Sequence, residues 1–251
     1  MTIHDPLTVK AHSTQRIDWI APSNSCVACS AREVTFCGKL TDSDRSWPLA
    51  KNTETARARD VIYHANQPTD HIYVVCEGWA FRFHRLRDGR RHILSFLISG
   101  DFISINGVFT GNSSFSIQAL TDVRYCKFER AQVRSLLQQD PEIFDAWVAT
   151  GASVQRETGR TSVALGRFLA HERIAWLILQ LRDRLAARGV INSDAIEFPL
   201  RQSHIADATG LTTVHACRVI NSFRKAGLFA IEDGILRIFD LAKLRRLVDV
   251  M

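Results

Sequence analysis

The chain has 251 residues, of which 46% are apolar, so it can bury the cores of two globular domains. No apolar run reaches the roughly 18 residues that a membrane span needs, and the first residues lack the basic start and apolar stretch of a signal peptide, so we expect a cytoplasmic protein without a membrane partner. The net charge is +6, and most of it lies in residues 156–251, which contain 15 Lys and Arg and 10 Asp and Glu. This excess of positive charge favours a polyanionic partner for the C-terminal part of the chain. A solvated basic surface without such a partner would carry the same charge.

Residues 1–44 are rich in Ser, Thr and Cys and show little hydrophobic periodicity, so we interpret them as an N-terminal arm that needs something to organise it. Cys26, Cys29 and Cys37 lie in this arm. A reducing compartment disfavours disulfides, so a cluster of cysteines there indicates metal or redox chemistry.

The sequence pattern of residues 45–139 predicts a β-domain. Short runs of alternating apolar residues are separated by turn signals: HIYVVCEGWAFRFHRL, the Asp88-Gly89 turn, RHILSFLISG, FSIQAL and VRYCKF. Strands of this length and spacing are typical of an antiparallel β-roll or sandwich. Cys76 lies in one of these apolar runs, where we interpret it as a small core residue.

Residues 140–170 predict a long helix that begins at Asp140-Pro141. Some of its residues recur at alternating spacings of three and four, which predicts a dimerisation seam: Phe144, Trp147, Gly151, Val154, Thr158, Thr161, Leu165 and Phe168. A helix that lies on its own domain is the alternative. A second helix, from His171 to about Ala187, ends at the Gly189 stop signal and opens the last domain, residues 171–251.

The stretch QSHIADATGLTTVHACRVI, residues 202–220, has the spacing of a helix-turn-helix. Ala206 is small where two helices must approach closely, and Gly210 stands where the turn needs a positive φ. Ile205, Leu211, Ala216 and Val219 can fill the space between the helices. A hairpin over residues 228–239, turning at Asp233-Gly234, completes a winged helix-turn-helix.

The second helix of such a motif enters the major groove of DNA with its N-terminal residues at the base edges. Val214, Cys217 and Arg218 fall on one face of this helix. Arg218 is the candidate base reader, because its guanidinium can pair with two acceptors of guanine. Thr212, Thr213 and Arg201 are candidates for phosphate contacts.

The order of these parts resembles the CRP/FNR family over nearly the whole chain: a cyclic-nucleotide-binding-like β-roll, a long dimerisation helix and a winged helix-turn-helix, which together make an α+β fold. The segment GDFISINGVF, residues 100–109, is similar to the Gly-Asp-Phe segment of that family, and AHERIAWLIL, residues 170–179, to its link between the helix and the DNA domain. The resemblance implies a homodimer that binds a twofold site in double-stranded promoter DNA and contacts RNA polymerase.

Two departures from the family pattern bear on specificity. Many members carry a glutamate at the start of the base-reading face, where this chain has Val214, so we expect an altered DNA half-site. Cyclic-AMP-binding members carry a glutamate and an arginine after the Gly-Asp-Phe segment, where this chain has Ile105 and, approximately, Phe115. We therefore expect no cyclic AMP, because its phosphate would be buried without a charge partner.

The cysteines resemble the FNR-like branch (FnrN-, FnrL- and FixK-type). In its oxygen-sensing members, three cysteines of the arm and a fourth at the end of the β-roll hold a [4Fe-4S] cluster. The resemblance carries this ligand set onto Cys26, Cys29, Cys37 and Cys126, and implies a regulator that is active without oxygen. The spacing of seven residues before Cys37 is longer than in the best-known FNR.

A cluster-free FixK-like regulator, controlled by thiol oxidation, zinc or expression level, is the alternative. It shares all the DNA-binding residues and differs only at the cysteines. An enzyme is not predicted, because the nine histidines are scattered and the chain has neither an HExxH motif nor a phosphate-binding glycine loop.

Overall fold

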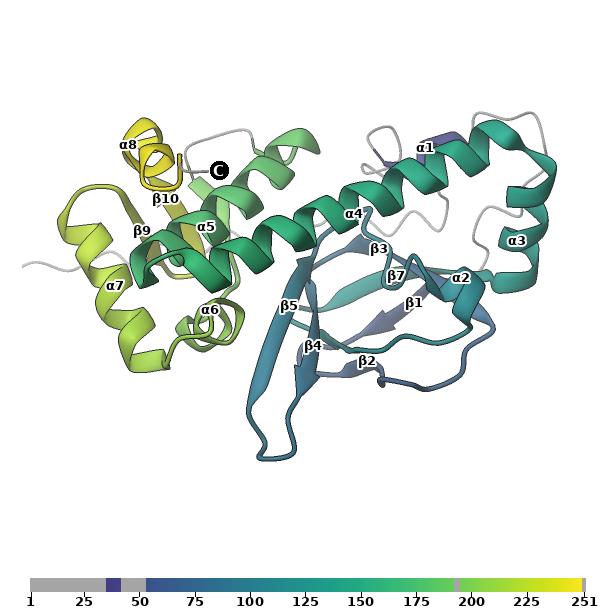
Figure 1. Ribbon diagram of the computed structural model, residues 1–251, viewed down its shortest axis with the longest axis horizontal. Coiled ribbons are helices and arrows are strands. Elements are labelled where there is room, and N and C mark those ends of the chain that lie inside the picture. The colour runs from purple at the N-terminus through teal and green to yellow at the C-terminus, as the bar shows by residue number, and fades with distance from the viewer. Residues whose placement is uncertain (1–34, 42–52, 192–194, 250–251) are drawn as a thin grey trace, which may run out of the picture.

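The computed structural model describes residues 35–41, 53–191 and 195–249. Figure 1 shows a β-roll beneath one long helix, α4 (Pro141–Arg167), with a smaller C-terminal domain at the far end of that helix. This arrangement confirms the predicted α+β fold class. Within the described ranges, no helix has the length and apolar character that crossing a membrane requires.

The β-roll consists of two antiparallel sheets, with strand orders β1-β7-β3 and β2-β6-β4-β5. The strands are β1 (Thr53–Ala56), β2 (Val61–Tyr63), β3 (His71–Glu77), β4 (Ala80–Arg85), β5 (Arg91–Leu97), β6 (Ser116–Ala119) and β7 (Val123–Glu129). Alternation along β3 gives each side of its sheet a separate core. Val75 packs between the two sheets, whereas Val74 and Cys76 pack in a layer between β3, β7 and the helices.

Four helices adjoin the roll: α1 (Phe36–Thr41), α2 (Gly107–Thr110), α3 (Arg130–Gln139) and α4. The sequence predicted α4 but not α3, which follows β7 directly and buries Val133 and Leu137. Asp140 caps α4 by accepting hydrogen bonds from the backbone N–H groups of Glu142 (3.1 Å) and Ile143 (3.2 Å). The predicted start signal therefore marks the observed helix start.

Most residues of the predicted seam of α4 face the β-roll of their own chain. Trp147 and Phe168 are buried, and the residues between them line a cavity against the roll: Gly151, Val154, Thr158, Thr161 and Leu165. The dimerisation role of this seam stays a prediction. The exposed apolar side chains of α4 are Phe144, which belongs to the predicted seam, and Val148 and Val163.

The C-terminal domain packs helices against a small sheet of strand order β8-β10-β9. Its elements are α5 (Ala170–Ala187), β8 (Ala195–Glu197), α6 (Gln202–Thr209), α7 (Thr213–Lys225), β9 (Phe229–Glu232), β10 (Ile235–Ile238) and α8 (Leu241–Arg246). The hairpin turns at Asp233 (φ 52°) and Gly234 (φ 75°), as predicted. Strand β8 pairs with β10 and extends the wing to three strands.

The β-roll and the C-terminal domain share one hydrophobic core. Trp79, Phe81 and Phe96 of the roll belong to the same buried cluster as side chains of α5, α6 and α7. The rings of Trp79 and Phe198 meet edge to face, with centroids 6.1 Å apart. The two domains are thus packed against each other by apolar burial, which is the main source of stability in such an interface.

Candidate nucleic-acid interface and thiol site

Helices α6 and α7 form the predicted helix-turn-helix. Gly210 ends α6 with φ +67°, and its N–H donates to the Ala206 carbonyl. Ala206 and Ala216 are fully buried between the helices, where a larger side chain would keep them apart. The positive φ and the small residues are both as predicted.

The start of α7 is the exposed part of this motif. The Thr212 hydroxyl caps the helix by accepting from the His215 N–H at 3.2 Å. Thr212, Thr213, Val214 and Arg218 are exposed, and Cys217 is half-buried. The link between α6 and α7 and the first two helical turns of α7 therefore bring five of the six predicted DNA-contact residues onto one surface.

The sixth residue, Arg201, is exposed at the N-cap of α6. Arg218 has no hydrogen bond or ion pair with any described residue. Arg224, nearer the end of the same helix, lies 3.9 Å from the Glu232 carboxylate. The guanidinium of Arg218 is therefore available to an external acceptor.

Helix α6 is held against the β-roll by Arg91 of β5. Its guanidinium donates to the Asp207 carboxylate of α6 at 2.7 and 2.9 Å and lies over the ring of Phe81, 4.9 Å from the centroid. His204 of α6 packs against the same ring, with centroids 5.7 Å apart. Burial, then the positive charges of Arg91 and Arg201, lower the pKa of His204 to about 4, so its imidazole is neutral at pH 7.

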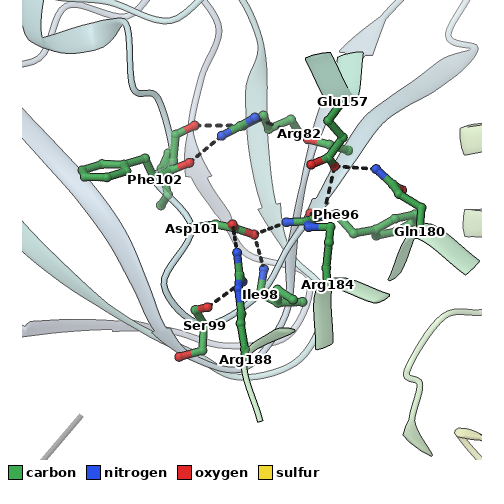
Figure 2. Close-up of polar contacts among 12 residues, drawn as sticks. Arg82, Phe96, Ile98, Ser99, Asp101, Phe102, Glu157, Gln180, Arg184 and Arg188 are labelled. Carbon is green, nitrogen blue, oxygen red and sulfur yellow. Dashed lines mark hydrogen bonds and ion pairs between the residues drawn. The ribbon is translucent and has the colours of Figure 1, made fainter. Parts of the chain in front are cut away.

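A second ionic contact joins the domains at Asp101, in the predicted Gly-Asp-Phe segment (Figure 2). Its carboxylate accepts from Arg184 and from Arg188, both at 2.5 Å, and from the Ile98 N–H at 2.8 Å. Burial raises the pKa of Asp101, but the two guanidinium groups more than offset this, and the pKa lies below its ordinary value. Glu157 of α4 adds a contact of 3.3 Å to Arg184, so three elements meet at this network.

The thiol site lies on the opposite side of β3 and β7 from the roll interior. Of the four predicted cluster ligands, Cys26 and Cys29 fall outside the described residues. Cys126 of β7 is buried in the layer between the sheet and the helices, and Cys37 of α1 packs partly buried against the same layer. Among the described residues, no group of three side chains is arranged to hold a metal ion.

Aromatic packing places Cys37 there. The ring of Phe36 contacts Trp147 of α4 (centroids 5.2 Å apart) and Phe102 (5.5 Å apart). This contact anchors α1 beside the sheet. Phe36 has no distinguishing signal in the sequence, because it is one of several isolated apolar residues in an arm that shows little periodicity.

Cys76 is a buried core residue, as predicted, and its Sγ lies 2.6 Å from the Sγ of Cys126, a proximity that the sequence did not predict. Only the pairing of β3 with β7, which are 50 residues apart at these cysteines, brings the two thiols together. The site therefore holds three described thiols rather than two.

Two family descriptions match the chain. Residues 53–140 match the cyclic nucleotide-binding domain, and residues 172–247 match the Crp-like helix-turn-helix domain. The two matches cover the β-roll and the C-terminal domain in the order that the sequence predicts. The chain belongs to the CRP/FNR family. It carries that family's DNA-binding domain, and its similarity falls in the FNR/FixK branch.

Relatives of this CRP/FNR protein are named as regulators. The nitrogen fixation regulation protein FixK of Bradyrhizobium diazoefficiens is 27% identical over 224 residues, covering 88% of this chain and 93% of that protein. The transcriptional activator protein FnrL of Cereibacter sphaeroides is 25% identical, covering 82% and 84%. The structure of FixK2 from Bradyrhizobium japonicum shares the fold, with a TM-score of 0.71 and 23% identity over 78% of this chain and 96% of that one.

The cavity between the β-roll and α4 of this CRP/FNR protein has a volume of about 780 Å³. Ile105 and Phe115 line it, and these are the residues that stand where the family resemblance places the glutamate and the arginine of cyclic-AMP-binding members. Arg82 of β4 also lines it, but its guanidinium donates to the backbone carbonyls of Phe102 and Ile103. Burial lowers the pKa of Arg82 to about 10. The prediction that this protein does not bind cyclic AMP depends on these side chains.

Proposed function

We propose that this protein regulates transcription by binding a twofold promoter site as a homodimer, with α7 of each subunit in the major groove, and by contacting RNA polymerase. The observation that carries the proposal is the exposed start of α7, where Arg218 has no partner among the described residues. Arg218 reads a base pair, while Thr212, Thr213 and Arg201 contact phosphates and Val214 and Cys217 lie against the bases.

Arg218→Ala tests the reading role. A bidentate arginine contributes about 1–3 kcal/mol of discrimination, so the variant should lose its preference at one base pair of each half-site. Binding to a library of randomised half-sites measures that preference. Arg224→Ala, a change on the same helix at a residue that faces Glu232, is the control and should keep the preference. Equal weakening on every sequence by Arg218→Ala would reassign Arg218 to the phosphate backbone.

The exposed apolar side chains of α4 support the homodimer. Phe144 (42% exposed), Val148 (51%) and Val163 (46%) are not covered by the β-roll of their own chain. A second copy of the chain that packs its own α4 there would bury them. Val148→Glu should then shift the protein to a monomer in sedimentation equilibrium and weaken DNA binding. A variant that stays dimeric would place the interface elsewhere.

A finer proposal concerns the signal: Cys26, Cys29, Cys37 and Cys126 hold a [4Fe-4S] cluster, and the bound cluster supplies an oxygen-sensitive connection between the arm and the β-roll. The chemistry of the described donors fits this group, because Cys37 and Cys126 pack in one apolar layer that limits contact with water. Phe36 holds α1 beside that layer through Trp147 and Phe102. The name of the FnrL relative is consistent with it.

Iron and acid-labile sulfide content, with a visible spectrum, on protein purified without oxygen tests the finer proposal. We expect about four irons per chain and a band that bleaches in air. Cys37→Ser should lose both the iron and tight DNA binding, whereas Cys217→Ser, the matched control, should keep the iron. Intact DNA binding without iron would favour the second candidate, a cluster-free regulator of the FixK type, to which the FixK relative is the parallel.

A further inference from the structure

Cys76 and Cys126 form a close thiol pair on neighbouring antiparallel strands. Cys126 of β7 lies opposite Val74 of β3, and Cys76 stands where the register shifts, between Val75 and Glu77. The two Sγ atoms are 2.6 Å apart. Both residues are buried, with 4% and 7% of their surfaces exposed. The two sulfurs are therefore close enough for a disulfide bond to form with a small movement.

The pair has a route to solvent. Cys76 lines a cavity of about 1110 Å³ between the β-roll and α5, which is open to the surface. Its walls include charged side chains, among them Glu77, Arg124 and Arg188. A small polar oxidant such as hydrogen peroxide fits such a cavity, whereas a protein oxidant does not reach the buried sulfur.

We propose that Cys76 and Cys126 are a disulfide-forming site whose oxidant is hydrogen peroxide. One thiol attacks the peroxide, the O–O bond breaks, and a sulfenic acid and one molecule of water form. The second thiol then attacks the sulfenic sulfur, the S–O bond breaks, and the S–S bond forms with release of a second water. The two thiols lose two electrons and two protons, and the peroxide is reduced to water.

The bond has a consequence for the cluster ligands, and this step rests on the proposed cluster function. Cys126 is a predicted ligand, and its sulfur cannot ligate iron while it is bonded to Cys76. Cys76 therefore competes with the metal for Cys126. Loss of the cluster in the presence of peroxide leaves a disulfide that must be reduced before the site can be loaded again.

The site itself is tested on the full-length, metal-free, reduced protein. A stoichiometric amount of hydrogen peroxide is added, free thiols are alkylated under denaturing conditions, and peptides are mapped by mass spectrometry. We expect a linked Cys76–Cys126 peptide pair in the wild type and in Cys217→Ser, and none in Cys76→Ser or Cys76→Ala. The two substitutions at Cys76 guard against misfolding of either one. Recovery of Cys126 alkylated, or bonded to a cysteine of the arm, would overturn the proposal.

The effect of the disulfide on cluster loading is tested separately, by measuring how much iron the protein regains. Wild-type and Cys76→Ala proteins loaded without oxygen are bleached with peroxide and then offered ferrous iron and sulfide at the stoichiometry of one cluster, with or without prior treatment with a thiol reductant. We expect the wild type to regain its iron several-fold better after reduction, and Cys76→Ala to regain it equally well either way. Equal recovery by the wild type would refute the competition. If neither protein ever binds iron, the cluster proposal fails, while the mapped disulfide still stands.

Discussion

The contact of Asp101 with Arg184 and Arg188 gives the sharpest energetic prediction. All three side chains are largely buried, with 15%, 18% and 16% of their surfaces exposed. Removing one partner of a buried ion pair costs about 3–5 kcal/mol, because the remaining charges stay buried without compensation. Asp101→Asn preserves the shape of the side chain but removes its charge, and the amide oxygen can still accept one hydrogen bond. We therefore expect the free energy of unfolding to fall by about 3 kcal/mol, at the lower end of that range.

Thermal unfolding at pH 7 measures this loss. For a chain of this size, 1 kcal/mol corresponds to about 2–4 °C in Tm, so the midpoint should fall by about 6–12 °C. Asp88→Asn is the control: its carboxylate pairs with Arg90 at 2.7 Å, but both side chains are more than half exposed, so Tm should change very little. A Tm for Asp101→Asn that matches the control would refute the reasoning.

The same pair predicts a dependence on pH. Because the pKa of Asp101 is lower in the folded chain than in the unfolded one, the carboxylate stabilises the folded state above its ordinary pKa. This contribution is lost as the pH falls through the folded pKa. The wild type and Asp101→Asn should therefore converge in stability under acidic conditions.

Two further predictions concern a turn and the α6 interface. Gly78 has φ +81°, and a Cβ there would lie 2.1 Å from the Asp122 carbonyl oxygen, so Gly78→Ala should cost about 3 kcal/mol or more in unfolding free energy, from strain plus the clash. Gly89→Ala is the control: Gly89 has φ +86° with open space around it, so this variant should lose only about 1 kcal/mol of unfolding free energy, from strain. If urea titrations give equal losses of unfolding free energy for the two variants, the clash is excluded as the cause. His204 has a folded pKa of about 4, below its ordinary value, so neutral His204 stabilises the folded state above about pH 6.5 and this contribution is lost as the pH falls toward 4. His204→Asn, which keeps an acceptor for the Arg201 N–H, should flatten that part of the stability profile, and an unchanged profile would contradict the assignment.

Local signals in the sequence accounted for most of the secondary structure and for the helix-turn-helix. Asp140-Pro141 predicted the start of α4, and Gly210 predicted the turn between α6 and α7, because a cap and a positive φ depend on the residue itself and its immediate neighbours. The missed helix α3 has little local signal: its N-cap, Glu129, makes no side-chain capping bond, and only Val133 and Leu137 are buried.

The candidate DNA surface followed from the same local signals. Once the register of α7 was known, helical geometry placed Val214, Cys217 and Arg218 on one face. That Arg218 has no described partner while Arg224 faces Glu232 depends on the wing, which the sequence positioned only as a hairpin. The surface and its candidate base reader were thus predictable, and the structure adds the surroundings of the two arginines.

The sequence by itself determined the kinds of element, their order and the residues of the recognition helix, because hydrophobic period, caps and turns act over a few residues. Only the tertiary structure decided which side of α4 the β-roll covers, which guanidinium groups meet Asp101, and that Cys76 lies against Cys126. Asp101 and Arg188 are 87 residues apart, and the two cysteines are 50 apart. The physical reason is that such contacts depend on which strands pair and which domains dock, and the free energy that selects those arrangements is spread over the whole core rather than held by the residues that meet.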